Sequence, residues 1–286
     1  MAKSLKISTF SPSKTLSGSI KGNVIPIVLL HGWGLNSGVW QPLLALFNDN
    51  KESNYQLITI DLPGFGINSD VAIEPYSLIN ICQHINQIID QPAIYLGWSL
   101  GGLIATEMAL KYPEKVLALI TVASSPYFVE EPITNWPGIK ENILNNFHQQ
   151  LATDTAKTIS GFLKIQAMGS PHIRQDLKLI TKLVMDHPLP NQKTLSDSLA
   201  LLSHCDLRLK LSSIEIPFLR LYGSNDSLVP KAVINNIKNL APKSQQHIFD
   251  YASHAPFISH LDDFYQVLFS WLESQYPNVV DKSIGN

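Results

Sequence analysis

Short apolar runs alternate with helical patterns through the first half of the chain. Runs at residues 25–30, 55–60, 93–98 and 116–123 are nearly continuous in Ile, Leu, Val and other apolar residues. Such runs are typical of parallel strands that are covered by helices on both faces. Three of them end in loops of small or turn-forming residues, HGWG, DLPGFG and ASSP. Because an open parallel sheet binds ligands at the carboxyl ends of its strands, we expect functional residues in these loops.

The strand pattern stops between residues 126 and 211. Two apolar stripes with helical spacing replace it, one through Ile139, Ile143, Phe147 and Leu151 and the other through Ile173, Leu177, Ile180 and Val184. This spacing predicts amphipathic helices. Strand patterns return at residues 216–223 and 246–252, and residues 264–271 predict a closing helix.

The order of these segments predicts an α/β fold with a mostly parallel central sheet, helices on both of its faces and an inserted helical cap. We assign residues 24–125 and 212–277 to the core and residues 126–211, called the cap region below, to the insertion. Residues 1–23 are interpreted as a poorly ordered leader and residues 278–286 as a tail.

Composition limits the classes of function. The 286 residues are 45% hydrophobic and 15% charged, which is enough apolar material for a large core, and the formal net charge of −2 gives no overall attraction to nucleic acid or anionic membranes. The apolar runs fall far short of the ~18 residues of a membrane span, and the first residues contain no signal-peptide core. Cys82 and Cys205 form no C-x-x-C pair, so we expect buried thiols and no metal site. These features predict a cytoplasmic protein, which we expect to be a monomer.

Ser99 lies where a strand pattern changes to a helix pattern, in IYLGWSLGGLIA. Gly97-x-Ser99-x-Gly101 matches the nucleophile elbow, a sharp strand-to-helix turn that raises a serine hydroxyl above the end of a sheet. Glycines permit the strained turn and the close approach of neighbouring backbone. A glycine-lined turn without chemical importance has the same local pattern, so the interpretation depends on partners elsewhere in the chain.

The partners of such a serine follow it in the order acid, then histidine. Asp226 comes after the strand at 216–223, and His254 comes after the strand at 246–252. Both positions are loops at the carboxyl ends of late strands. The sequence therefore predicts an α/β-hydrolase fold with Ser99, Asp226 and His254 as catalytic residues.

Three other residues compete for these roles. His260 stands at the start of the closing helix, where a capping or solvated role is expected. Asp250 lies on the strand that leads to the histidine, four residues before it, where it is poorly placed to orient the ring, and is interpreted as a surface residue. Asp61 precedes the serine, which breaks the expected order, so we expect a turn-forming role for it.

The loop LLHGWG follows an early strand, where this fold places its second oxyanion-hole donor. We expect the backbone N–H groups of Trp33 and Leu100 to form the oxyanion hole, and His31 to fix the loop through hydrogen bonds. Ser124 and Ser125 follow a strand without a glycine elbow, and we expect them to line or support the pocket.

Longer motifs carry a narrower resemblance. VLLHGWGLNSGVW, DLPGFG, LGWSLGGL, TVASSP, WPGIK, FLKIQAMG, FLRLYG and HAPFISH together resemble the pimeloyl-[acyl-carrier-protein] methyl ester carboxylesterases, a family of biotin-pathway α/β-hydrolases. The resemblance runs from about residue 24 to the last helix and includes the cap region. It implies the same triad and oxyanion hole, no cofactor, and an acyl channel under the cap that is lined by Phe162, Leu163, Lys164, Ile165 and Gln166.

The partner implied by the resemblance is an acidic acyl carrier protein that bears a pimeloyl methyl ester. We expect it to dock on basic residues of the cap region, Lys157, Arg174, Lys178 and Lys182. The last three are spaced by four residues and lie on one helix face, with Asp176 as the only acid between Lys157 and Lys182. Such a stripe is also typical of a merely solvated face. The chain departs from the arginine-rich pattern of the family here, because most of these residues are lysines, which are weaker bidentate partners.

The resemblance implies a serine esterase that releases methanol from the carrier-bound ester. Two alternatives stay open, since fold and triad do not determine the substrate. One is a broad short-chain carboxylesterase or carbon–carbon bond hydrolase of the same fold, and the other is a ligand-binding protein without catalysis.

Overall fold

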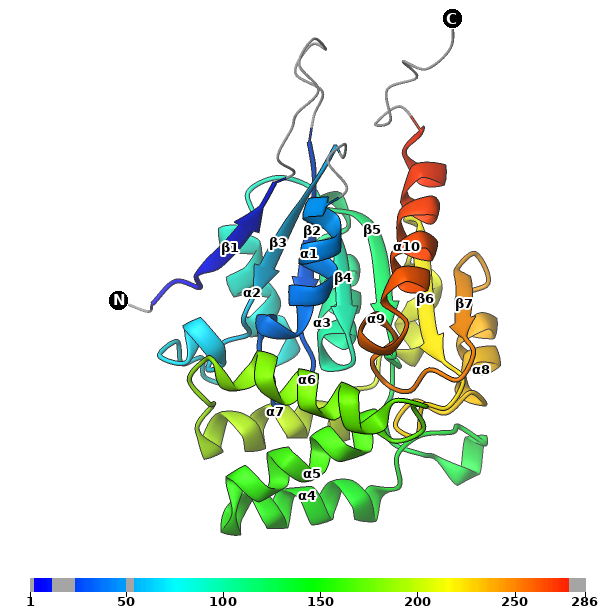
Figure 1. Cartoon of the computed structure of the whole chain (residues 1–286). Coiled ribbons are helices and arrows are strands. Elements are labelled where there is room, and N and C mark those ends of the chain that lie inside the picture. The colour runs from blue at the N-terminus through cyan, green and yellow to red at the C-terminus, as the bar shows by residue number, and fades with distance from the viewer. Residues whose placement is uncertain (1–2, 12–23, 50–53, 278–286) are drawn as a thin grey trace, which may run out of the picture.

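A computed structural model describes residues 3–11, 24–49 and 54–277 of the chain (Figure 1). Its centre is a seven-stranded sheet with the order β1-β3-β2-β4-β5-β6-β7. The strands are β1 (Ile7–Phe10), β2 (Ile25–Leu30), β3 (Tyr55–Ile60), β4 (Ala93–Trp98), β5 (Val116–Val122), β6 (Phe218–Gly223) and β7 (Gln245–Phe249). All neighbouring pairs are parallel except β1 with β3, which is antiparallel. The prediction of an α/β-hydrolase fold with a mostly parallel sheet is confirmed.

The central strands are formed by the continuous apolar runs of the sequence. Every residue of β4 is buried, and β2, β3 and β5 are buried over nearly their whole length. This burial follows from helices on both faces: α1 (Gln41–Asp49) and α10 (Leu261–Gln275) lie in front of the sheet in Figure 1, and α2 (Leu78–Ile88), α3 (Leu100–Lys111) and α8 (Val233–Leu240) lie behind it. The short α9 (Pro256–Ser259) precedes α10.

The interpretation of residues 1–23 as a poorly ordered leader is wrong for residues 7–10. They form β1 at the edge of the sheet, where Ile7 to Phe10 pair with Leu57 to Ile60 of β3. The strand alternates exposed and half-buried residues, so it has no continuous apolar run by which it could be recognised. Residues 12–23 and the tail at 278–286 lie outside the described residues.

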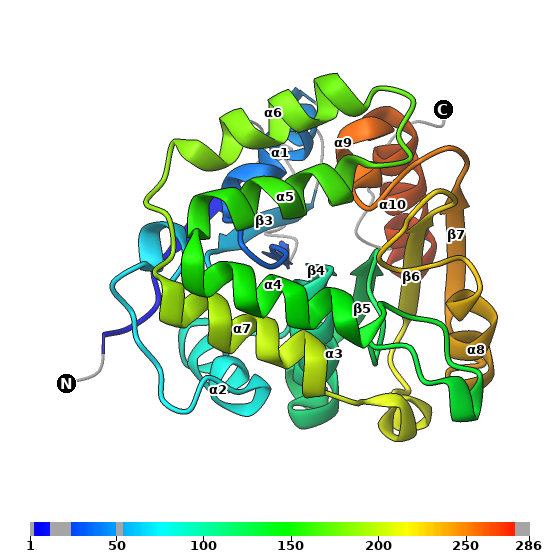
Figure 2. The same ribbon diagram turned by 90° about the horizontal axis from the view of Figure 1, so that it is seen from below.

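Between β5 and β6 the chain forms four longer helices in the cap region. These are α4 (Glu141–Thr153), α5 (Thr155–Ala167), α6 (Ile173–Met185) and α7 (Gln192–His204). Figure 2 shows them lying across the carboxyl ends of the strands. The stripes predicted at residues 139–151 and 173–184 fall largely on α4 and α6, and their later members, from Phe147 and Ile180 onward, are buried. Ile143 and Ile173, which were predicted in the stripes, are exposed. We propose residues 126–211 as the cap, with the remainder of the described chain as the core.

In the described part of the chain, no helix combines the length and the apolar character that crossing a bilayer would require. Of the two cysteines, Cys82 is buried and Cys205 is half-buried, and both are free thiols.

Candidate active site

Ser99 occupies a strained turn between β4 and α3. Its backbone has φ 54° and ψ −116°, an unfavourable conformation for a residue with a side chain. The turn exists because its glycines leave space: a Cβ on Gly97 would collide with the carbonyl of Gly101, and a Cβ on Gly101 would collide with the carbonyl of Leu30. The GWSLGG sequence is therefore required for the close contact of β4, α3 and β2 that holds Ser99 in place.

Two hydrogen bonds brace the backbone of Ser99. Its N–H donates to the carbonyl of Val122 on β5 at 2.9 Å, and its own carbonyl accepts from the Ser124 hydroxyl at 2.8 Å. Ser124 is buried. The prediction that Ser124 supports the site is confirmed by this bond, which holds the strained turn at Ser99 against the end of β5.

Asp226 and His254 meet in the interior. His254 Nδ1 lies 2.8 Å from Asp226 Oδ2, and both side chains are almost completely buried. The other carboxylate oxygen, Oδ1, accepts the backbone N–H groups of Leu228 at 2.8 Å and Val229 at 3.0 Å. Since a carboxylate only accepts hydrogen bonds, Nδ1 carries the proton and Nε2 is the acceptor of the neutral ring.

His254 is also held through its backbone. Its carbonyl accepts from the indole of Trp98 at 2.7 Å, and its N–H donates to the carbonyl of Gln166 on α5 at 3.3 Å. His254 Nε2 is buried and makes no hydrogen bond within the described residues. A free acceptor at this atom is what a general base needs, and the bond from a serine hydroxyl often forms only with substrate bound. The role of Trp98 was not foreseen, although the residue directly precedes the nucleophile candidate.

The Leu100 N–H is the first of α3, so it has no acceptor within its own helix. Neither it nor the Trp33 N–H donates a backbone hydrogen bond among the residues that the structure describes. The Trp33 side chain is fully buried, and its indole donates to the carbonyl of Leu195 on α7 at 3.0 Å. Free N–H groups in a buried loop and at a helix N-terminus are suited to stabilising a developing oxyanion.

His31 fixes the loop that contains Trp33, as expected. Its Nδ1 lies 2.8 Å from the Gly32 carbonyl, and its Nε2 accepts the N–H of Leu62 at 3.0 Å. Burial lowers the pKa of His31, more strongly than the neighbouring Asp61 carboxylate raises it. In the neutral ring, both nitrogens of His31 therefore have hydrogen-bond partners. Neither nitrogen is free for an acid–base role.

The rival residues occupy structural or surface positions. The carboxylate of Asp61 accepts backbone N–H groups from Ser37 and Ile67 and so joins two loops. Asp250 is exposed beyond β7. His260 precedes α10 but makes no side-chain capping bond; its Nδ1 instead lies 2.8 Å from the Ser259 hydroxyl.

The five residues expected to line an acyl channel all lie on α5, but they do not share one face. Phe162, Leu163 and Gln166 are buried, Ile165 is half-buried, and Lys164 is exposed. Consecutive residues turn around a helix axis by about 100° each, so five of them cannot all point into one channel. The exposure of Lys164 favours a place on the outer surface, and the lining of the channel stays a prediction. The ring of Phe162 packs edge-on against Trp33, with 4.7 Å between ring centroids.

Gln166 is the polar residue on this buried face. It is completely buried, and neither Oε1 nor Nε2 of its side chain has a hydrogen-bond partner among the described residues. Burying an unpaired amide is costly, typically ~1–3 kcal/mol. An amide in this state beside the His254 backbone is suited to binding a polar group of a ligand.

The predicted docking residues lie on the outside of the cap region. Lys157 on α5 and Arg174, Lys178 and Lys182 on α6 are all exposed. None of them forms an ion pair with another described residue. Asp176 is buried and accepts a hydrogen bond from Ser170, so the only acid between Lys157 and Lys182 is withdrawn from this surface.

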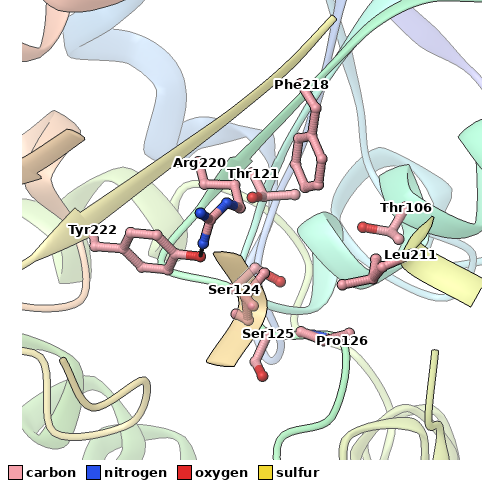
Figure 3. A pocket seen from close by; sticks show the side chains of 10 residues that line it. Thr106, Thr121, Ser124, Ser125, Pro126, Leu211, Phe218, Arg220 and Tyr222 are labelled. Atoms are coloured by element: carbon pink, nitrogen blue, oxygen red, sulfur yellow. Dashed lines mark hydrogen bonds between the residues drawn. The ribbon is translucent and has the colours of Figure 1, made fainter. Parts of the chain in front are cut away.

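A small cavity lies beside Ser124, and its lining combines apolar and polar side chains (Figure 3). Its lining includes Thr121, Ser124, Ser125, Arg220 and Tyr222 but neither Ser99 nor His254. Arg220 is completely buried and donates to four neutral acceptors, the side chains of Ser244, Tyr222 and Gln246 and the carbonyl of Ile234. These bonds hold the Arg220 guanidinium in place, so we interpret its role as structural.

In the described ranges, His, Cys, Asp and Glu residues form no cluster of three that could hold a metal ion. The groups that the structure places at the candidate site are the serine, the histidine, the carboxylate and the backbone donors. A serine at a strained strand-to-helix turn, with a buried histidine–aspartate pair from later loops, defines the class of α/β-hydrolases.

Comparison with known proteins narrows this class. A family model described as the alpha/beta hydrolase fold matches residues 25–261. The pimeloyl-[acyl-carrier protein] methyl ester esterase of Photobacterium profundum is 45% identical over 248 residues, which cover 87% of this chain and 94% of the relative. The protein of the same name from Aliivibrio fischeri is 42% identical over 255 residues, covering 88% and 95%. The chain belongs to this family of esterases within the α/β-hydrolases.

Among solved structures, the esterase EaEST from Exiguobacterium antarcticum superimposes with a TM-score of 0.80 at 21% identity, covering 94% of this chain and 95% of the esterase. This likeness shows the common fold.

Proposed function

We propose that the protein hydrolyses the methyl ester of pimeloyl-[acyl-carrier protein] to the free carboxylate and methanol, as a step of biotin synthesis. The observation that carries the proposal is the buried Asp226–His254 pair, with Nδ1 and Oδ2 at 2.8 Å, in a chain that shares 45% identity with an esterase of this name. No cofactor is required for the reaction. The cytoplasmic location and the monomeric state stay predictions from the sequence.

In the proposed mechanism, Ser99 Oγ attacks the ester carbonyl while His254 Nε2 accepts the hydroxyl proton. The negative charge that develops on the carbonyl oxygen accepts hydrogen bonds from the N–H groups of Trp33 and Leu100. Asp226 keeps the proton on Nδ1 and stabilises the imidazolium that forms. The imidazolium then gives its Nε2 proton to the departing methoxide, and methanol leaves.

The acyl group now forms an ester with Ser99, and a water molecule repeats the sequence. His254 Nε2 takes a proton from the water as it attacks the acyl carbonyl, and the tetrahedral intermediate collapses with return of that proton to Ser99 Oγ. The product is the free carboxylic acid, still attached to its carrier through the other end of the chain. No oxidant, reductant or metal is needed to balance either half of the reaction.

We propose that the acyl chain lies under the cap region against the buried face of α5. Phe162 and Leu163 supply apolar contacts, Ile165 contributes at the margin, and the unpaired amide of Gln166 binds a polar group of the substrate. Lys164, which is exposed, belongs instead to the outer surface. The carrier itself docks on Lys157, Arg174, Lys178 and Lys182, whose charges are not neutralised by other described residues.

The decisive experiment is growth rescue of a biotin-requiring strain that lacks its own pimeloyl ester hydrolase. The wild-type gene is expected to restore growth without biotin, and the Ser99→Ala gene is expected to fail at the same protein level. A purified enzyme should release methanol from the carrier-bound ester. Rescue by neither gene, combined with efficient hydrolysis of short free esters, would support the broad carboxylesterase instead. Absence of any serine labelling by a fluorophosphonate would support the ligand-binding alternative.

A further inference from the structure

Asn36 connects the loop of the oxyanion hole with the cap region. It lies three residues after Trp33 and is almost completely buried, with 2% of its surface exposed. Its Oδ1 accepts the N–H of Gly38 at 3.0 Å and so caps the short helix η1 (Ser37–Trp40). Its Nδ2 donates to the carbonyl of Val184, in the last turn of α6, at 2.9 Å. One amide thus serves the local turn and a helix 148 residues further along the chain.

The last turn of a helix contains carbonyl groups without partners in the helix, and other groups must donate to them. The Val184 carbonyl accepts the N–H of His187 at 3.3 Å, and Asn36 adds a second, shorter bond from outside α6. The fit is close, because a Cβ on Gly38 would collide with the carbonyl of Leu183, the residue before Val184. The backbone of η1 is therefore pressed directly against the end of α6, and Asn36 is the side chain that bonds across this contact.

Trp33 makes a second bond from the same loop to the cap region. Its indole donates to the Leu195 carbonyl on α7 at 3.0 Å. On the other side, the loop is bound to the core, where the Ser37 N–H donates to the carboxylate of Asp61. The segment from Trp33 to Ser37 is consequently held between the core and two helices of the cap region, and the backbone N–H of Trp33 lies within it.

We infer that Asn36 is a positioning residue that makes the placement of the Trp33 N–H depend on the docked position of α6. The inference rests on the proposed function for its catalytic consequence. When α6 lies against η1, the bond from Asn36 to Val184 holds the loop in the conformation that stabilises the oxyanion. When α6 moves away, the loop loses that bond and the donor loses its fixed position. Arg174, Lys178 and Lys182 lie on the same helix, so a carrier bound there stabilises the docked position and with it the oxyanion hole.

The test separates the two bonds of Asn36. In Asn36→Ser the hydroxyl can still accept from the Gly38 N–H, since serine is a good helix cap, but it is too short to reach Val184. In Asn36→Ala both bonds are lost. Asn80→Ser is the control for the loss of an asparagine bond away from the cap region: Asn80 Nδ2 also donates to a backbone carbonyl at 2.9 Å, that of Pro75, in an exposed bond at the start of α2. The substrate is p-nitrophenyl butyrate, and a trifluoromethyl ketone that adds to Ser99 serves as a mimic of the tetrahedral intermediate.

We expect Asn36→Ser and Asn36→Ala to lower kcat by about tenfold with KM changed by less than about twofold, because loss of a complete oxyanion donor costs about 10²–10³ in kcat and a misplaced donor costs part of this. Affinity for the ketone should fall by the same factor as kcat/KM, while the binding of butyrate and the kinetics of Asn80→Ser stay at the wild-type level. A merely structural role would not produce this selective loss of affinity for the intermediate mimic.

The inference is overturned if Asn36→Ser has wild-type kcat while Asn36→Ala is impaired, since the local cap would then be the important bond. It is equally overturned if ketone and butyrate affinities fall together. If Asn36→Ser does not fold, Asn36→Asp replaces it, because this side chain has the same shape and still accepts from Gly38. A wild-type enzyme that cleaves the small ester but not the carrier-bound ester would refute the proposed function, whereas the Asn36 comparison would still decide this inference.

Discussion

The carboxylate of Asp226 uses its two oxygens for separate tasks with respect to His254. Oδ2 lies 2.8 Å from His254 Nδ1, and Oδ1 is held by the backbone N–H groups of Leu228 and Val229. The carboxylate therefore cannot rotate without losing two backbone hydrogen bonds. This arrangement fixes the orientation and the tautomer of a histidine that is 28 residues away in the chain.

Asp226→Asn is expected to reduce kcat strongly, by about 10³- to 10⁴-fold, with little loss of folding stability. The asparagine amide can donate to Nδ1, which then favours the tautomer with the proton on Nε2, and that atom can no longer accept the serine proton. Steady-state kinetics on a short ester measure the effect. Asp250→Asn is the control, since Asp250 is exposed, and should keep the wild-type rate. If Asp250→Asn instead lost its activity while Asp226→Asn kept the wild-type kcat, the catalytic acid would be wrongly assigned.

Ser99→Ala is expected to remove at least ~10³-fold of the esterase rate, because the hydroxyl is the proposed nucleophile. The side chain makes no hydrogen bond within the described structure that the fold would lose. Thermal unfolding should therefore stay close to that of the wild type, and a fluorophosphonate probe should label the wild type alone. Substantial turnover by pure Ser99→Ala would falsify the assignment.

His31 should make the folded protein sensitive to mild acid. Burial lowers its pKa below the ordinary value near 6.5, so the unfolded chain binds the proton first as the pH falls. The contribution of neutral His31 to the free energy of unfolding is fully present above about pH 6.5. It falls progressively below that pH, until the pH passes the lowered pKa of the folded state. Protonation also ends the bond in which Nε2 accepts the Leu62 N–H.

The measurement is urea unfolding at pH 7.5 and 5.5 for the wild type and His31→Gln, whose amide oxygen can accept from Leu62 but does not titrate in this range. His31→Gln should be the less stable protein at pH 7.5, and the gap in free energy of unfolding should narrow at pH 5.5. A constant gap at both pH values would show that His31 does not contribute to the acid sensitivity.

Glu107 gives a pH effect of the opposite sign. It lies on α3, is only 7% exposed, and its Oε2 has no hydrogen-bond partner among the described residues. Burial raises its pKa, an effect that Lys210 and Lys111 partly offset. As the pH rises above 4.5, the ordinary pKa of a glutamate, the carboxyl group ionises in the unfolded chain before it ionises in the folded protein. Ionisation therefore favours unfolding, and the stability that the protonated group contributes is lost above that pH.

Glu107→Gln is therefore expected to raise the free energy of unfolding at pH 8 relative to the wild type, with a smaller gain at pH 5. Chemical denaturation at the two pH values measures the difference. Glu114→Gln, at an exposed position, serves as the control for loss of one negative charge. Destabilisation by Glu107→Gln at pH 8 would indicate that the charged carboxylate has a stabilising partner.

The sequence predicts those elements that have continuous apolar patterns. The bounds of β2, β3 and β4 agree with the predicted runs because each of these strands is buried on both faces, so no polar residue interrupts it. β1 is missed because an edge strand exposes alternate residues. The turn at Ser99 is predicted because its glycines are required by close backbone contacts, which leave a mark in the sequence.

Contacts between distant segments cannot be predicted in this way. The bond from Trp98 to the His254 carbonyl and the bond from Asn36 to Val184 depend on the relative positions of elements that are more than a hundred residues apart. The exposure of Lys164 follows from the rotation of α5 about its axis, which is determined by packing against Trp33 and other core residues. A motif transferred as a block of five residues does not contain this information.

The exposed basic residues of α6 provide the last prediction. Lys178→Glu combined with Lys182→Glu should raise the KM for the carrier-bound ester several-fold, because the two charges attract an acidic carrier and have no ion-pair partner among the described residues. Turnover of p-nitrophenyl butyrate should hardly change, since a small ester reaches Ser99 without contacting α6. Reversal of Lys157 and Arg174 in addition should enlarge the effect, because single exposed charges contribute little.

The control is Lys115→Glu combined with Lys243→Glu, which makes the same change in net charge before β5 and β7, at the end of the sheet away from the cap region. This variant should retain the wild-type KM for both substrates. Added salt should raise the wild-type KM for the carrier-bound ester and remove most of its advantage over the α6 variant, since attraction between exposed charges is screened beyond ~8 Å at physiological ionic strength. Equal losses on both esters would indicate a damaged cap. Equal KM values for the two double variants would place the carrier on another surface.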